Sequence, residues 1–144
     1  MQRLVLDTNV WIDWLVFDDS AVAPVRAAVA SGQAEVWYDP AGETELAEVL
    51  GRKLGRRQLT AEEQNACLAQ LRAVARRNDG AGAGAGTLPR CSDPDDQKFL
   101  ELARDCGAGL LLTRDQALLD LGRRAGKQLS FRIAAPRELA GALS

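Results

Sequence analysis

The chain has 144 residues, of which 47% are hydrophobic and 26% are charged, and its formal net charge is −2. These values predict one domain over residues 1–144 with a hydrophobic core, and the lack of a basic excess argues against non-specific coating of nucleic acid. Because the sequence has no histidine, histidine-assisted serine or cysteine catalysis and histidine-bound zinc are excluded, and hydrolytic chemistry would need carboxylates, lysine or a metal with oxygen ligands.

The cysteines and the first residues of the chain indicate a cellular compartment. Cys67, Cys91 and Cys106 are odd in number and form no C-x-x-C pair, so they predict neither a disulfide framework nor a zinc site. No signal-peptide pattern opens the sequence, and no apolar run reaches the length of a membrane span. We therefore expect a cytoplasmic protein that does not associate with a membrane.

The first half of the chain predicts strands that alternate with helices. Residues 3–7 form a short apolar run that ends in an acid, as expected of a buried strand, and Thr8 and Asn9 can begin the following helix. Proline in the first turn favours a helix after Asp39, and Thr60 opens a capping box. The predicted elements are strands over 3–7 and 34–38, and helices after residue 9 and over 21–30, 40–54 and 60–78.

The second half begins with the low-complexity run GAGAGAG at residues 80–86, which we interpret as a surface loop. Its alternating glycines have no strand before them and no helix after them, so they are not a dinucleotide-binding motif. The later predictions are helices over 93–106, 116–124 and 136–143, and strands over 110–113 and 129–133. This alternation predicts an α/β fold with a mostly parallel sheet of four to five strands.

Two acids lie where predicted strands end. Asp7 ends the first strand, and Asp115 follows the strand over 110–113. Because ligands bind at the carboxyl ends of the strands in open parallel sheets, these two acids could converge on one site. The alternative is that each simply caps the helix that follows it.

Further acids lie on two predicted helices. On the helix from Pro40, the apolar stripe rejects Glu48 but does not choose between Glu43 and Glu45, and all three could be a solvated helix edge. On the helix from Asp93, Asp95 and Asp96 fall on the core-facing side. Buried carboxylates without partners are costly, so these two acids suggest a cation; the alternative is that they stabilise the positive end of the helix dipole.

Four motifs together resemble the PIN domain family, in particular its bacterial branch of VapC-type toxin ribonucleases. The motifs are LVLDTNVWI, ETELAEVL, SDPDDQKFLELA and LLLTRDQALL, and the resemblance extends from Leu4 to about Leu139. It implies a three-layer α/β/α fold and a metal-dependent endoribonuclease that acts as the toxin of a type II toxin–antitoxin pair. It also implies an RNA substrate, an antitoxin partner and a homodimer.

The resemblance also implies particular site residues. The catalytic acids of the family correspond to Asp7, Glu45, Asp96 and Asp115. Asn9 stands at the position of a polar helper, and Thr113 at that of a small hydroxyl residue.

Crowded carboxylates favour a hard divalent cation, and oxygen ligands favour Mg²⁺ or Mn²⁺. We expect Glu45 to orient the attacking water, while Asn9 and Thr113 orient carboxylates. Whether one or two ions bind, and whether Asp93 or Asp95 joins or replaces Asp96, stays open. The candidate metal ligands are Asp7, Asp93, Asp96 and Asp115.

A basic cluster follows the helix that carries Glu45. Arg52, Lys53, Arg56 and Arg57 could grip phosphates beside the acids, although such a cluster is equally typical of a soluble surface. Two other functions compete with the ribonuclease. One is a PIN-like module that only binds an antitoxin or another protein, and the other is a phosphatase of the haloacid-dehalogenase type, which would need an aspartate where this chain has Asn9.

Overall fold

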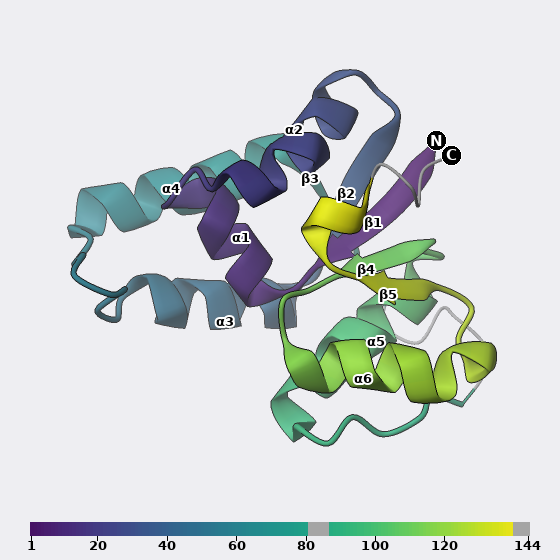
Figure 1. Cartoon of the computed structure of the whole chain (residues 1–144). Coiled ribbons are helices and arrows are strands. Elements are labelled where there is room, and N and C mark those ends of the chain that lie inside the picture. Colours follow the sequence, from purple (N-terminus) through teal and green to yellow (C-terminus); the bar gives the residue numbers. More distant parts are fainter. Residues whose placement is uncertain (81–86, 140–144) are drawn as a thin grey trace.

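The computed structural model describes residues 1–80 and 87–139. Its five strands form one all-parallel sheet in the order β3-β2-β1-β4-β5 (Figure 1). The α/β fold with a parallel sheet is therefore confirmed. The strands are β1 (Gln2–Leu6), β2 (Ala34–Tyr38), β3 (Ala75–Arg77), β4 (Leu110–Leu112) and β5 (Arg132–Ala134).

Helices cover both faces of the sheet, which is why its central strands are apolar on both sides. In β1, Leu4 and Leu6 enter one core and Val5 enters the other. The first core packs against α1 (Thr8–Leu15), α2 (Ala23–Ala30), α3 (Pro40–Leu50) and α4 (Ala61–Val74). The second packs against α5 (Gln97–Asp105) and α6 (Gln116–Ala125), so the predicted three layers are confirmed (Figure 1).

Several predicted boundaries were wrong. The helix expected over 40–54 ends at Leu50, and the helix expected over 60–78 ends at Val74 and leads directly into β3. Strand β3 escaped prediction because it is a three-residue edge strand whose two arginines are exposed, so it lacks the apolar pattern of a buried strand. The last strand, β5, occupies 132–134 instead of 129–133.

Short 3₁₀ helices account for the remaining described elements: η1 (Ser20–Val22), η2 (Pro94–Asp96), η3 (Gly126–Gln128) and η4 (Pro136–Glu138). The helix expected over 93–106 thus begins as η2 and continues as α5. Residues 81–86 of the predicted surface loop and residues 140–143 of the predicted last helix lie outside the described residues. Within the described part of the chain, no helix has the length and apolar character needed to cross a membrane.

Candidate metal centre

Two neighbouring strands bring Asp7 and Asp115 to the same edge of the sheet. Strands β1 and β4 pair in parallel with Leu6 opposite Leu112, so the residues that follow them emerge together. Asp7 caps α1 by accepting a hydrogen bond from the Val10 amide at 3.1 Å. Asp115 caps α6 in the same manner, from the Ala117 amide at 2.8 Å. Asp7 and Asp115 therefore lie at one site and also cap the helices that follow them.

The third group of acids comes from η2, the short turn that precedes α5. Asp93 caps this turn by accepting a hydrogen bond from the Asp95 amide at 3.0 Å. One carboxylate oxygen from each of Asp93, Asp96 and Asp115 lies within 4.8 Å of the other two. The structure thus brings Asp93 and Asp96 together with Asp115, while Asp95 is not part of this closest group.

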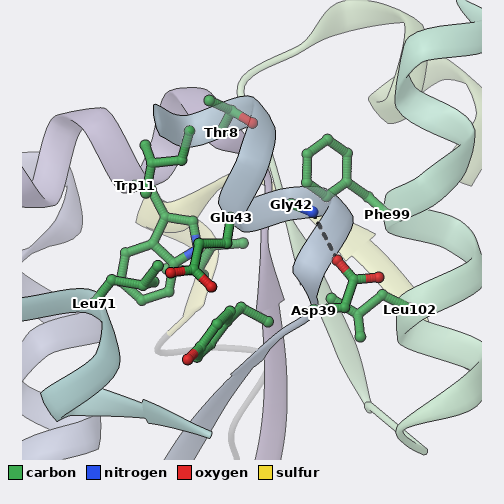
Figure 2. Close-up of a pocket in the computed structure, with 11 residues that line it drawn as sticks. Thr8, Trp11, Asp39, Gly42, Glu43, Leu71, Phe99 and Leu102 are labelled. Atoms are coloured by element: carbon green, nitrogen blue, oxygen red, sulfur yellow. Dashed lines mark hydrogen bonds between the residues drawn. The ribbon is translucent and has the colours of Figure 1, made fainter. Parts of the chain in front are cut away.

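Glu43 and Glu45 have different surroundings on α3. Glu43 faces a small, mostly apolar cavity beside Trp11 and Leu71 (Figure 2), and its carboxylate forms an ion pair with Arg72 at 2.6 Å. Glu45 instead lines the same cavity as the aspartates. Glu48 is exposed, as the stripe pattern predicted.

All four predicted catalytic acids line one open cavity of about 210 Å³, which we call the acidic pocket. Six carboxylates surround it, and its lining also includes the predicted helper Asn9. Thr113 is buried behind this lining, where its hydroxyl donates a hydrogen bond to Asp7 and accepts one from the Asp115 amide at 2.9 Å. The lining residues are Asp7, Thr8, Asn9, Glu45, Val49, Asp93, Asp95, Asp96, Phe99 and Asp115.

The crowding of negative charge shifts two carboxyl groups in the acidic pocket. Burial is the main cause that raises the pKa of Asp7, and the charge of Asp115 adds to it. The pKa of Asp96 is raised to about 7, first by burial and then by the charges of Asp115, Asp93 and Asp7. The carboxyl group of Asp96 therefore titrates near neutral pH when no cation is bound.

The same residues satisfy the chemical requirements of a hard divalent cation. The donors are carboxylate oxygens, which suit Mg²⁺ or Mn²⁺. One oxygen of Asp96, Oδ2, is buried and has no hydrogen-bond partner among the described residues. Such an atom is costly unless something pairs with it, and a cation between Asp93, Asp96 and Asp115 would do so.

Sequence reasoning missed two residues that hold Glu45. The Thr8 hydroxyl donates a hydrogen bond to Oε2 of Glu45, and Lys98 on α5 forms an ion pair with Oε1 at 2.8 Å. The spacing places Lys98 one helical turn after Asp95, but it gives no signal for a contact with Glu45. This contact was missed because the sequence does not show that α3 and α5 meet.

The four residues of the basic cluster have different surroundings in the folded chain. Arg52 lines a groove that shares Glu45, Val49 and Asp95 with the acidic pocket. Arg57 is held elsewhere, because it donates a hydrogen bond to the Val16 carbonyl at 3.1 Å and forms an ion pair with Glu63 at 3.4 Å. The other two members, Lys53 and Arg56, are exposed.

Comparison with known proteins identifies the family. Residues 3–117 match the PIN domain family, which is most of the chain, and this protein belongs to that family. The family predicted from the four motifs is thereby confirmed, although the match ends before Leu139. No curated protein matches the chain significantly.

A solved structure is similar in fold. It is the crystal structure of VapBC2 from Rickettsia felis bound to a DNA fragment from their promoter. One of its chains superposes with a TM-score of 0.61 over 92% of this chain and 97% of its own length, at 10% sequence identity. At that identity the likeness concerns the fold and not the chemistry of the site.

Proposed function

We propose that this protein is a metal-dependent endoribonuclease that hydrolyses RNA phosphodiester bonds in the acidic pocket. The observation that carries the proposal is the gathering of six carboxylates around one cavity at the carboxyl end of the sheet. Such crowding is unfavourable without a counter-charge, and the unpartnered Asp96 oxygen marks where a cation would bind. Membership of the PIN family, whose domains are generally nucleases, supports the same activity.

Each pocket residue has a role in this proposal. Asp96 and Asp115, with Asp93 beside them, would hold Mg²⁺ or Mn²⁺, and Asp7 would bind it directly or through water. A divalent ion bound there would supply a water of lowered pKa and would neutralise charge that develops on phosphate oxygens. Glu45 accepts hydrogen bonds at the wall of the pocket and would orient the attacking water.

Residues around these acids would orient them and hold the substrate. Thr113 fixes the carboxylate of Asp7 and the backbone of Asp115, and Asn9 offers an amide at the rim. In the predicted RNA-binding cluster, Arg52 lines the groove beside the acidic pocket, and Lys53 and Arg56 are exposed. Arg57 would have to leave Glu63 in order to contribute.

We further propose that the ribonuclease is the toxin of a type II toxin–antitoxin pair, acting in the cytoplasm as a homodimer that an antitoxin inhibits. The family and the similarity in fold to a VapBC2 chain support this. Expression of the chain alone in a bacterial host should arrest growth, and Asp7→Asn should relieve the arrest. Equal growth arrest by both proteins would contradict the toxin proposal.

The direct test is cleavage of a single-stranded RNA with Mn²⁺ or Mg²⁺, compared with EDTA. Cleavage should require the metal, and Asp7→Asn should abolish it while circular dichroism shows an intact fold, because asparagine also caps helices well. The matched control is Asp18→Asn, which changes an exposed acid outside the acidic pocket.

Two results would overturn the proposal. Cleavage that Asp7→Asn leaves unchanged would place the site elsewhere. A wild-type protein that binds Mn²⁺ but cleaves no RNA would favour the PIN-like binding module. The phosphatase alternative has lost support, because the chain belongs to the PIN family and carries Asn9 where that enzyme needs an aspartate.

A further inference from the structure

Lys98 connects two of the elements that build the acidic pocket. It is the second residue of α5, and its ammonium lies 2.8 Å from Oε1 of Glu45 on α3. The same ammonium donates a hydrogen bond of 2.5 Å to the carbonyl oxygen of Asp95 in η2. It also lies 5.3 Å from the centre of the Phe99 ring.

These contacts distinguish Lys98 from an ordinary surface lysine. Its side chain is only 24% exposed, and that of Glu45 is 27% exposed, so water screens the ion pair less than it screens a fully solvated one. Among the described residues, Lys98 is the only cationic side chain paired with a carboxylate that lines the acidic pocket. Because the Thr8 hydroxyl holds the other oxygen of Glu45, both ends of that carboxylate are fixed.

We infer that Lys98 is a positioning residue: it fixes the carboxylate of Glu45 at the wall of the acidic pocket and sets the spacing between α3 and η2. This inference rests on the proposed function. Through Glu45, Lys98 controls where the attacking water is held, and through the Asp95 carbonyl it steadies the turn that carries Asp96.

The contacts argue against a phosphate-binding role for Lys98. An ammonium has three donors, and two of them already point at Glu45 and at the Asp95 carbonyl. Arg52, which lines the same groove, has no such partners among the described residues and is better placed to contact a phosphate. Loss of Lys98 should therefore slow turnover without weakening RNA binding.

Kinetics of three variants test this role. Lys98→Met should lower kcat for RNA cleavage by about tenfold or more, with KM within about twofold of the wild type. Lys98→Arg, which keeps the charge and the reach, should restore most of kcat. Lys127→Met is the matched control, because Lys127 is exposed beyond the far end of α6, and it should cleave like the wild type.

Each other outcome would overturn the role. A raised KM with normal kcat would make Lys98 a substrate contact, and an unchanged kcat would remove it from the mechanism. An equal loss in the Met and Arg variants, with a lowered unfolding temperature in both, would mean a purely structural role. If Lys98 acts through Glu45, then Lys98→Met should cause no further loss in a Glu45→Gln background, and an additive loss would contradict that.

A measurement that needs no cleavage separates this inference from the proposed function. In metal-free protein labelled with ¹³C at glutamate carboxyls, Lys98→Met should shift the Glu45 resonance, and Lys127→Met should leave it in place. A shifted resonance in a protein that cleaves no RNA would retain the contact but overturn the proposed function. An unmoved resonance in an active ribonuclease would overturn the positioning role alone.

Discussion

Asp13 is buried and Asp96 is partly buried, and burial raises the pKa of both, but the chain surrounds them differently. Asp13 on α1 lies against Arg114, whose Nε is 2.6 Å from Oδ2 and whose Nη2 donates a hydrogen bond to Oδ1 at 3.1 Å. The neighbours of Asp96 are other acids, and no salt bridge pairs it with a cation among the described residues. Each of the two aspartates has one buried oxygen, Oδ2, without a hydrogen-bond partner there, so the ion pair with Arg114 is what distinguishes them.

This difference is the one expected between an acid with a structural role, such as Asp13, and an acid available to bind a ligand, such as Asp96. Arg114 compensates part of the charge of Asp13, and the pair joins α1 to the loop that carries Asp115. No cation of the described residues compensates the charge of Asp96, which lowers the stability of the metal-free fold and favours a cation from solution. The comparison would fail if mutation of Asp13 affected RNA cleavage as strongly as mutation of Asp96, or if mutation of Asp96 lowered stability as mutation of Asp13 should.

The largest expected effect concerns cleavage. Asp96→Asn should lower the rate of RNA cleavage at saturating Mn²⁺ on the order of a thousandfold, because it removes a charged ligand from a metal worth several kcal/mol to the transition state. Asp13→Asn should leave the single-turnover rate close to that of the wild type. Comparable losses of cleavage rate in both variants would show that Asp96 has no specific role in cleavage.

A smaller effect is expected at Thr113, behind the acidic pocket. Thr113→Val keeps the shape of the side chain but removes the hydrogen bonds to Asp7 and to the Asp115 amide. We expect Mn²⁺ affinity to fall by roughly 10- to 100-fold, as calorimetric titration would show. Unchanged affinity for Mn²⁺ would mean that Thr113 contributes only to the packing of the core.

For stability we expect the reverse, with Asp13 contributing more than Asp96. Asp13→Asn should lower the free energy of unfolding by about 1–3 kcal/mol, because the asparagine amide nitrogen cannot accept a hydrogen bond and one of the two contacts with Arg114 is lost. Urea denaturation in EDTA measures this, with Asp18→Asn as an exposed control. A variant as stable as the wild type would remove the structural half of the comparison.

The smallest effect is a pH dependence of the metal-free protein. The pKa of Asp96 is about 7 in the folded chain and near 3.8 when unfolded, so between these values only the folded chain holds the proton. Stability in EDTA should therefore rise as the pH falls from about 8 to about 5, by roughly 1–2 kcal/mol after allowance for solvent screening. Asp96→Asn should flatten this profile, and an equally steep profile in that variant would contradict the assignment.

The fold class could be predicted because the central strands β1 and β4 are short apolar runs followed by polar residues. The acids that follow β1 and β4 could be placed together because parallel strands share a carboxyl edge. Strand β3 could not be predicted, since an edge strand with two exposed arginines carries no apolar pattern. The helix ends were misplaced for a related reason, because exposed residues near a terminus fit either a helix or a loop.

The candidate site was predictable only in part. Periodicity left Glu43 and Glu45 equivalent, and the contact of Glu43 with Arg72 on α4 separates them. That contact depends on how α3 packs against α4, which no local pattern encodes. The holding of Glu45 by Thr8 and Lys98 was hidden in the same way, because these residues come from α1 and α5.

The most direct measurement is the anomalous scattering of a crystal soaked in Mn²⁺. A peak within bonding distance of carboxylate oxygens from Asp93, Asp96 and Asp115 is the predicted result, with Glu45 and Lys98 still paired beside it. An acidic pocket that holds no manganese at concentrations that support cleavage, or an ion bound at another set of residues, would contradict the account.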